Sequence, residues 1–131
     1  MKNVISFIAS TLATAFVYYL GGWDIALQTL LIIIFLDYIT GVCKAIHNKK
    51  LNSEIGLKGI IKKVGYLIIV AVSVILDRIA GNTGAIRTLV IYFFVANEGI
   101  SILENWGGMG LPLPKKLTEM LEQLKNENDP K

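Results

Sequence analysis

Apolar residues in this chain fall in long blocks, not at the spacing of an amphipathic soluble helix. The blocks cover residues 4–20, 25–43, 64–81 and 85–105. Each approaches the roughly 20 residues that an α-helix needs to cross a bilayer. The pattern therefore predicts an all-α integral membrane protein with four transmembrane helices, joined by short connections into one membrane domain over residues 1–131.

The first block leaves two questions open. Ser6, Ser10 and Thr14 stand at four-residue spacing, which allows close packing against another helix, although incidental hydroxyl side chains on a lipid-facing helix produce the same spacing. Lys2 before an apolar core also fits the outline of a cleaved signal peptide. We favour a retained span, because the apolar run continues through residues 16–20.

Polar side chains interrupt the second and fourth blocks, in each case on one helical face. The second block carries them at positions i, i+3, i+4 and i+7, namely Asp37, Thr40, Gly41 and Lys44. In the fourth block five polar residues fall within an arc of about 120°, and these are Asn97, Glu98, Ser101, Glu104 and Asn105. A carboxylate within a bilayer costs at least about 2.5–3.5 kcal/mol, so both faces should meet protein or water.

The two faces are expected to lie at the same depth. At about 1.5 Å per residue, Asp37 lies roughly 18 Å from the start of its block, and Glu98 lies a similar distance from the start of the fourth. We interpret them as one shared polar layer, which either packs helices together, with Asp37 paired to Lys44 or to a neighbouring helix, or lines a water-filled lumen. The polar face of the fourth block would also suit a surface helix of a soluble bundle. The first three apolar blocks disfavour that alternative.

Charge adds an orientation to this picture. The 131 residues are 53% hydrophobic and 18% charged, whereas a soluble domain carries about a quarter charged residues. With four spans, eleven of the 13 basic residues lie on the side of both termini and the central loop, and only Arg78 and Arg87 lie on the other. The positive-inside rule then predicts a multi-pass membrane protein with both termini in the cytoplasm.

Two short amphipathic helices are predicted outside the spans. In the central loop, the apolar positions i, i+3, i+4 and i+7 are Leu57, Ile60, Ile61 and Val64. The basic residues beside them, which we assign to the inner membrane surface and its anionic lipid, are Lys58, Lys62 and Lys63. The cytoplasmic tail, residues 106–131, repeats the apolar spacing at Leu117, Met120, Leu121 and Leu124. This second helix is expected to bind a membrane surface or a partner helix.

The chain carries no recognisable catalytic, cofactor-binding or metal-binding motif. It has neither a Gly-rich phosphate loop nor a nucleophile beside a base, and His47 has no Cys or His partner at ligand spacing. Glu98 and Glu104 are better interpreted as intramembrane polar groups than as an acid–base pair. The basic residues lack interleaved aromatics, so no nucleic-acid partner is expected. We therefore expect neither an enzyme nor a cofactor.

Four motifs in order, covering roughly residues 35–125, resemble the toxin-secretion/phage-lysis holin family. They are Asp37-x-x-Thr40-Gly41, Ser53-x-x-Gly56-x-x-Gly59-x-x-Lys62-Lys63, Asn97-Glu98-x-x-Ser101-x-x-Glu104-Asn105 and Gly110-x-Pro112-x-Pro114. The resemblance implies a small homo-oligomer of the host inner membrane that makes lesions and releases an endolysin or a toxin. The next methionine after Met1 is Met109, so we expect no inhibitor form from a second nearby start.

Two other functions stay open from the residues alone. In a small proton-coupled multidrug-type exporter, Asp37 or Glu98 would be the coupling group, and activity would be graded transport instead of timed leakage. In a passive membrane subunit, the tail would recruit a partner protein. A pore, by contrast, requires assembly, because one copy has too few helices to enclose a large lumen.

Overall fold

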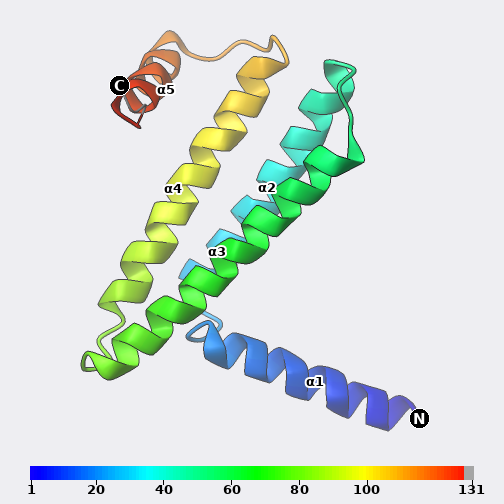
Figure 1. The fold of residues 1–131 in the computed structure, drawn as a ribbon, viewed down its shortest axis with the longest axis vertical. Coiled ribbons are helices and arrows are strands. Elements are labelled where there is room, and N and C mark those ends of the chain that lie inside the picture. The colour runs from blue at the N-terminus through cyan, green and yellow to red at the C-terminus, as the bar shows by residue number, and fades with distance from the viewer. Residues whose placement is uncertain (129–131) are drawn as a thin grey trace.

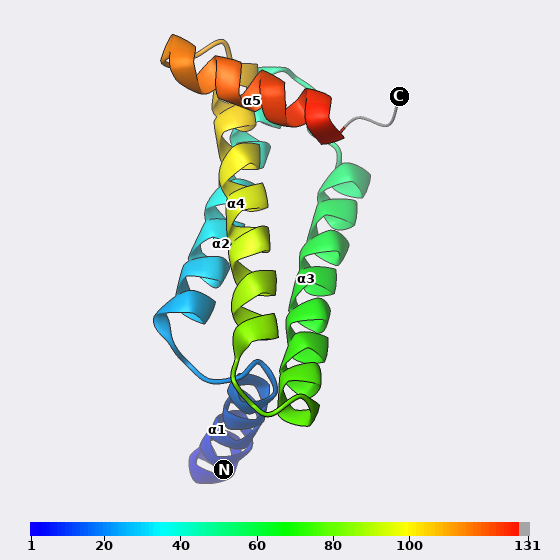
Figure 2. The same ribbon diagram turned by 90° about the vertical axis from the view of Figure 1, so that its left-hand side faces the viewer.

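The computed structural model describes residues 1–128, and within that range the chain forms five helices and no strand. In chain order they are α1 (Lys2–Tyr19), α2 (Ile25–His47), α3 (Ser53–Ile79), α4 (Ala85–Gly108) and α5 (Lys115–Asn128). The helices α2, α3 and α4 run side by side with alternating direction (Figures 1 and 2). At one end of this bundle α1 extends away from it, and at the other end α5 lies across it.

Short polar turns set where the bundle helices begin. The carboxylate of Asp24 accepts a hydrogen bond from the backbone N–H of Leu27 at 3.0 Å and caps α2. The side-chain oxygen of Asn52 accepts one from the N–H of Glu54 at 2.8 Å and caps α3. Between α1 and α2 the chain reverses at Gly21, whose φ of 93° favours glycine. These caps and turns place the polar residues of the bundle in register.

The bundle has a small, dry core and a large apolar outer surface. The side chains with no exposed area are Leu27, Leu30, Val70 and Ile91, contributed by all three helices. Tyr66 stacks on Phe94 with ring centroids 4.2 Å apart. Outward-facing residues such as Phe35 and Phe93 are 62% and 66% exposed. An apolar surface this extensive is typical of a protein surrounded by lipid.

Three helices of the described residues, α2, α3 and α4, are long and apolar enough to cross a membrane. The predicted spans 25–43 and 85–105 fall within α2 and α4, and the predicted span 64–81 ends two residues beyond α3. The predicted span 4–20 falls largely within α1, which is helical but less apolar, since it begins with Lys2 and Asn3 and carries four hydroxyl side chains of Ser and Thr. The four-span architecture is thus supported for three spans, and the role of α1 stays a prediction.

The central loop is shorter than predicted. Residues 53–63 do not form a separate surface helix, because they are the first turns of the continuous helix α3. The physical reason is that Asn52 caps the helix at its start and no proline interrupts it before Ile79. The predicted tail helix is present as α5, whereas its amphipathic role stays a prediction. Residues 129–131 of that tail lie outside the described part of the chain.

Candidate functional site

Each bundle helix contributes one charged side chain to a buried polar cluster, which consists of Asp37, Lys63, Glu98 and Asn105. Lys63 Nζ donates to Asp37 Oδ2 and to Glu98 Oε2, at 2.6 Å in both cases. Glu98 is 1% exposed and Asp37 is 7% exposed. Because α2, α3 and α4 each supply one member of this triad, the triad forms only when all three helices pack together.

Asn105 ties α4 to α2 beside the triad. Its Nδ2 lies 3.0 Å from Asp37 Oδ1 and 2.9 Å from Thr40 Oγ1, and it also reaches the Asp37 carbonyl oxygen at 3.3 Å. The Thr40 hydroxyl donates to the same carbonyl at 3.0 Å. A Cβ added at Gly41 would lie 3.6 Å from Asn105 Nδ2, so the glycine leaves room for this side chain. These bonds satisfy polar groups in the interior of the bundle.

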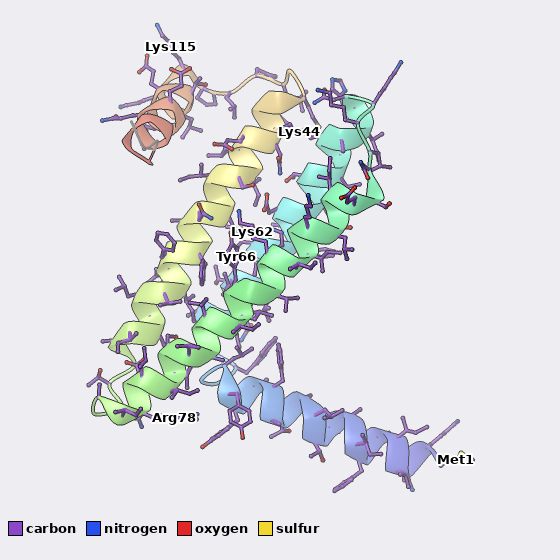
Figure 3. All side chains as sticks on the ribbon, in the orientation of Figure 1. Met1, Lys44, Lys62, Tyr66, Arg78 and Lys115 are labelled. Carbon is purple, nitrogen blue, oxygen red and sulfur yellow. The ribbon has the colours of Figure 1, made fainter. Side chains whose placement is uncertain are left out.

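A second link joins α3 to α4 about one turn away. Asn97 Nδ2 donates to the Tyr66 hydroxyl at 3.0 Å. The ammonium groups of Lys62 and Lys63 lie 5.8 Å and 6.0 Å from the centroid of the Tyr66 ring, within the range of a cation–π contact. Figure 3 shows Lys62 and Tyr66 midway along α3. The phenol ring therefore connects the stacked aromatic core to the polar cluster.

The structure brings most of the predicted polar residues together. Ser101 and Asn105 line one cavity with Asp37 and Gly41, whereas Glu104, which stands between them in the sequence, is half-buried outside that lining. Lys44 does not pair with Asp37. It reaches the end of α4 instead, where a Cβ added at Gly108 would lie 2.6 Å from its Cε.

The three lysines assigned to the membrane surface separate in the structure. Lys58 and Lys62 are exposed on α3, while the ammonium of Lys63 is directed into the bundle. The sequence pattern predicts a membrane-surface position for Lys63, and the structure corrects this prediction. A signal was available, because Lys63 stands three residues before Tyr66 and thus continues the buried face of α3 that includes Val70, Ser73 and Asp77.

The cluster joins the three bundle helices through hydrogen-bonded charges. Its two carboxylates and one ammonium carry a formal charge of −1, and breaking such a pair inside a bilayer is costly. Every buried side-chain nitrogen and oxygen in the described residues has a hydrogen-bond partner. In that same range no group of three or more His, Cys, Asp or Glu side chains could hold a metal ion.

A second polar cluster, centred on Arg87, holds the opposite end of the bundle. Arg87 Nη1 and Nη2 donate to the two carboxylate oxygens of Asp24 at 2.7 Å and 3.0 Å. Its Nε donates to the Leu20 carbonyl at 2.7 Å, and Nη2 also reaches the Gly22 carbonyl at 3.2 Å. The guanidinium thereby fastens the α1–α2 turn to α4 through four acceptors. The hydrogen bonds from Arg87 hold the pKa of Asp24 below its usual range, so this carboxylate stays ionised at neutral pH.

Neighbouring charges complete the Arg87 cluster. Asp77, 4% exposed, accepts from the backbone N–H groups of Ile86 and Arg87 at 2.9 Å and 2.8 Å, and so caps the first turn of α4 from α3. Arg78 donates to the Tyr18 carbonyl at 3.0 Å, and its Cζ lies 4.3 Å from the centroid of the Tyr18 ring.

Comparisons with known proteins identify the family. The model of the bacteriophage holin family matches residues 14–126. The "Uncharacterized 14.9 kDa protein in nagH 3'region" of Clostridium perfringens is 50% identical, covering 97% of this chain and 99% of the relative. A "Probable holin" of Bacillus phage phi105 is 34% identical, covering 86% and 84%. No solved structure matches the chain. With its three apolar bundle helices and a family match over most of its length, this chain belongs to the bacteriophage holin family.

Proposed function

We propose that the protein assembles in the bacterial cytoplasmic membrane into a lesion that releases an endolysin or a toxin and leads to lysis of the host cell. The observation that carries this proposal is the holin-family match over residues 14–126. The structure adds a physical reason for assembly. Leu27, Leu30, Val70 and Ile91 fill the centre of one bundle with no exposed area, so a single copy leaves no passage for a protein.

The polar cluster supplies the means of switching between a closed copy and an open assembly. In one copy, Asp37, Lys63, Glu98 and Asn105 satisfy one another across the three helices. In the assembly, the same groups exchange these partners for side chains of neighbouring copies and for water in a lumen. Such an exchange needs only a modest difference in free energy, and rising protein concentration in the membrane supplies the bias.

The distribution of charge supports an orientation for the assembly. Lys44 lies at the end of the bundle where α5 begins, and Arg78 lies at the opposite end (Figure 3). Lys49, Lys50, Lys115 and Lys116 also belong to connections or helix starts at the lysine-rich end. By the positive-inside rule, we place this end and the C-terminus in the cytoplasm. With α1 as a fourth span, the N-terminus lies there too.

The proposal is tested by inducing expression in bacteria while following the membrane potential and the escape of a large cytoplasmic reporter enzyme. We expect a delay, then an abrupt loss of potential together with release of the reporter. Glu98→Gln should keep release, because glutamine still offers an oxygen to Lys63 without a charge, whereas Glu98→Leu should lose it. Absence of release at full membrane expression, or release graded by an imposed proton gradient, would refute the lesion and favour an exporter.

A further inference from the structure

A cavity of about 340 Å³ at the lysine-rich end of the bundle is lined by α2, α3 and α4, and three of the four residues of the polar cluster face it. Asp37, Lys63 and Asn105 line its inner side. Lys50 and Lys62 line it as well and are exposed, so the cavity reaches the surface beside these two lysines.

The charges around this cavity favour an anion at its mouth. Three lysines, Lys50, Lys62 and Lys63, line it together with one carboxylate, Asp37. The ammonium of Lys63 is already held by Asp37 and Glu98. Lys50 and Lys62 therefore add two positive charges where the cavity meets its surroundings. The positive charge of both lysines favours a phosphate group at this mouth.

An apolar groove continues from the cavity along α2 and α3. It has a volume of about 370 Å³ and shares Tyr38 and Lys63 with the cavity. The rest of its lining is aliphatic or aromatic, and consists of Leu31, Ile34, Phe35, Ile60, Val64 and Leu67. A ligand that fills both spaces has a charged end and a long apolar end.

The two spaces also match the layers of a bilayer. Counted from Ile79 at about 1.5 Å per residue, Leu67 lies roughly 18 Å and Lys62 roughly 26 Å along α3. The hydrocarbon core of a bilayer is about 30 Å thick. The groove thus lies at the level of the acyl chains, while Lys62 lies near the headgroups and Lys50 precedes the helix altogether.

We propose that this cavity and groove form a specific site for an anionic phospholipid, with the phosphate at the mouth of the cavity, where Lys50 and Lys62 supply positive charge, and one acyl chain in the groove. The inference goes beyond lesion formation, because it assigns a lipid ligand to each copy. Since Lys63 and Tyr38 border both spaces, the bound lipid lies directly against the polar cluster. Its occupancy favours the packed arrangement of α2, α3 and α4 over one in which α2 and α3 separate.

The site is tested with a single indole placed in the groove. Full-length protein carrying Phe35→Trp, with Trp23→Phe and Trp106→Phe, is reconstituted into phosphatidylcholine vesicles that hold a minor fraction of phosphatidylglycerol. The bromine quencher is carried either on the phosphatidylglycerol chains or on an equal fraction of the phosphatidylcholine chains. We expect brominated phosphatidylglycerol to quench at least about threefold more strongly, because two lysines select the anionic lipid.

Three controls test whether the quenching preference depends on the groove and on its two lysines. The indole introduced by Phe93→Trp, on an exposed face of α4 at a similar depth, should show a quenching ratio near one. Lys50→Gln with Lys62→Gln should abolish the preference at Phe35→Trp, while Lys115→Gln with Lys116→Gln, which removes the same charge from α5, should keep it. An equal ratio at both indoles, a preference that survives the loss of Lys50 and Lys62, or its removal by added inorganic phosphate would overturn the lipid site.

Discussion

Replacing Lys63 with methionine is expected to lower the free energy of unfolding by about 3–5 kcal/mol, because the substitution leaves two buried carboxylates without their shared cation. Asp37 and Glu98 each lie 2.6 Å from Lys63 Nζ, and both carboxylates are almost fully buried. The change is measured by titrating the protein in mixed micelles with a denaturing detergent and following helix content by circular dichroism.

The cost should come from the uncompensated charge, not from the loss of a long side chain. Combining Lys63→Met with Asp37→Asn and Glu98→Gln removes every charge of the triad and should recover most of the lost stability. Lys62→Met, at the adjacent exposed position, should change stability by less than about 0.5 kcal/mol. If Lys63→Met and Lys62→Met behaved alike, the triad would have no part in holding the helices together.

Replacing Arg87 with methionine is expected to cost about 2–4 kcal/mol and to release the α1–α2 turn from the bundle. The guanidinium is 8% exposed and serves the carbonyls of Leu20 and Gly22 as well as Asp24. Without it, the buried Leu20 carbonyl loses its donor. Hydrogen exchange of the backbone amides of residues 20–24 should accelerate strongly. The helical amides at the other end of the bundle, near the connection between α2 and α3, should keep their protection.

Two further substitutions serve as controls for Arg87→Met. Arg87→Lys should be intermediate, because an ammonium cannot reproduce the forked contact with Asp24. Arg78→Met should have a smaller effect, since Arg78 is exposed and donates to a single carbonyl, that of Tyr18. Equal exchange rates in Arg87→Met and the unchanged protein would show that other contacts position the turn.

The periodicity of the sequence was sufficient to predict the polar faces of α2 and α4. Asp37 and Thr40 on one helix, and Glu98 and Asn105 on the other, stand at helical spacing within apolar blocks, and a carboxylate in such a block must find a partner. The structure places these groups in one layer, where Asn105 reaches both Asp37 and Thr40. Depth counted at a constant rise per residue therefore located the site.

The partner of the carboxylates could not be predicted as readily. Lys63 follows Lys58 and Lys62 in a basic stretch, and such a stretch has the same composition whether it lies on a membrane surface or begins a span. Only the register of α3, fixed by the cap at Asn52 and by the buried Tyr66, turns Lys63 inward while Lys62 stays outside. The Arg87 contacts depend on the turn at Gly21 and Gly22, whose backbone path no periodicity describes.

The packing of α1 is another feature that the apolar blocks of the sequence do not predict. Its residues form a regular helix of 18 residues, yet none of them is buried, and the helix extends away from the bundle (Figure 1). Its C-terminal end is held through Tyr18 and Leu20 by Arg78 and Arg87. A helix with no packed face in one copy is free to pack in an assembly. We therefore expect α1 to form the predicted fourth span there.

We propose that the exchange of partners requires the polar cluster to open between α2 and α4 before the membrane becomes permeable, and a reversible tether between these helices tests this requirement. Ile33 and Gly99 face each other across these helices, since a Cβ added at Gly99 would lie 3.7 Å from Ile33 Cδ1. In a Cys43→Ala background, Ile33→Cys and Gly99→Cys are joined by a short, reducible bis-methanethiosulfonate reagent, and the protein is reconstituted into dye-loaded vesicles. Ile33→Cys alone, treated with the same reagent, serves as the control. We predict that the tethered protein retains the dye and that reduction restores release to the level of the control. Full release from vesicles whose protein remains tethered would contradict the exchange of partners and show that intact bundles assemble into the lesion.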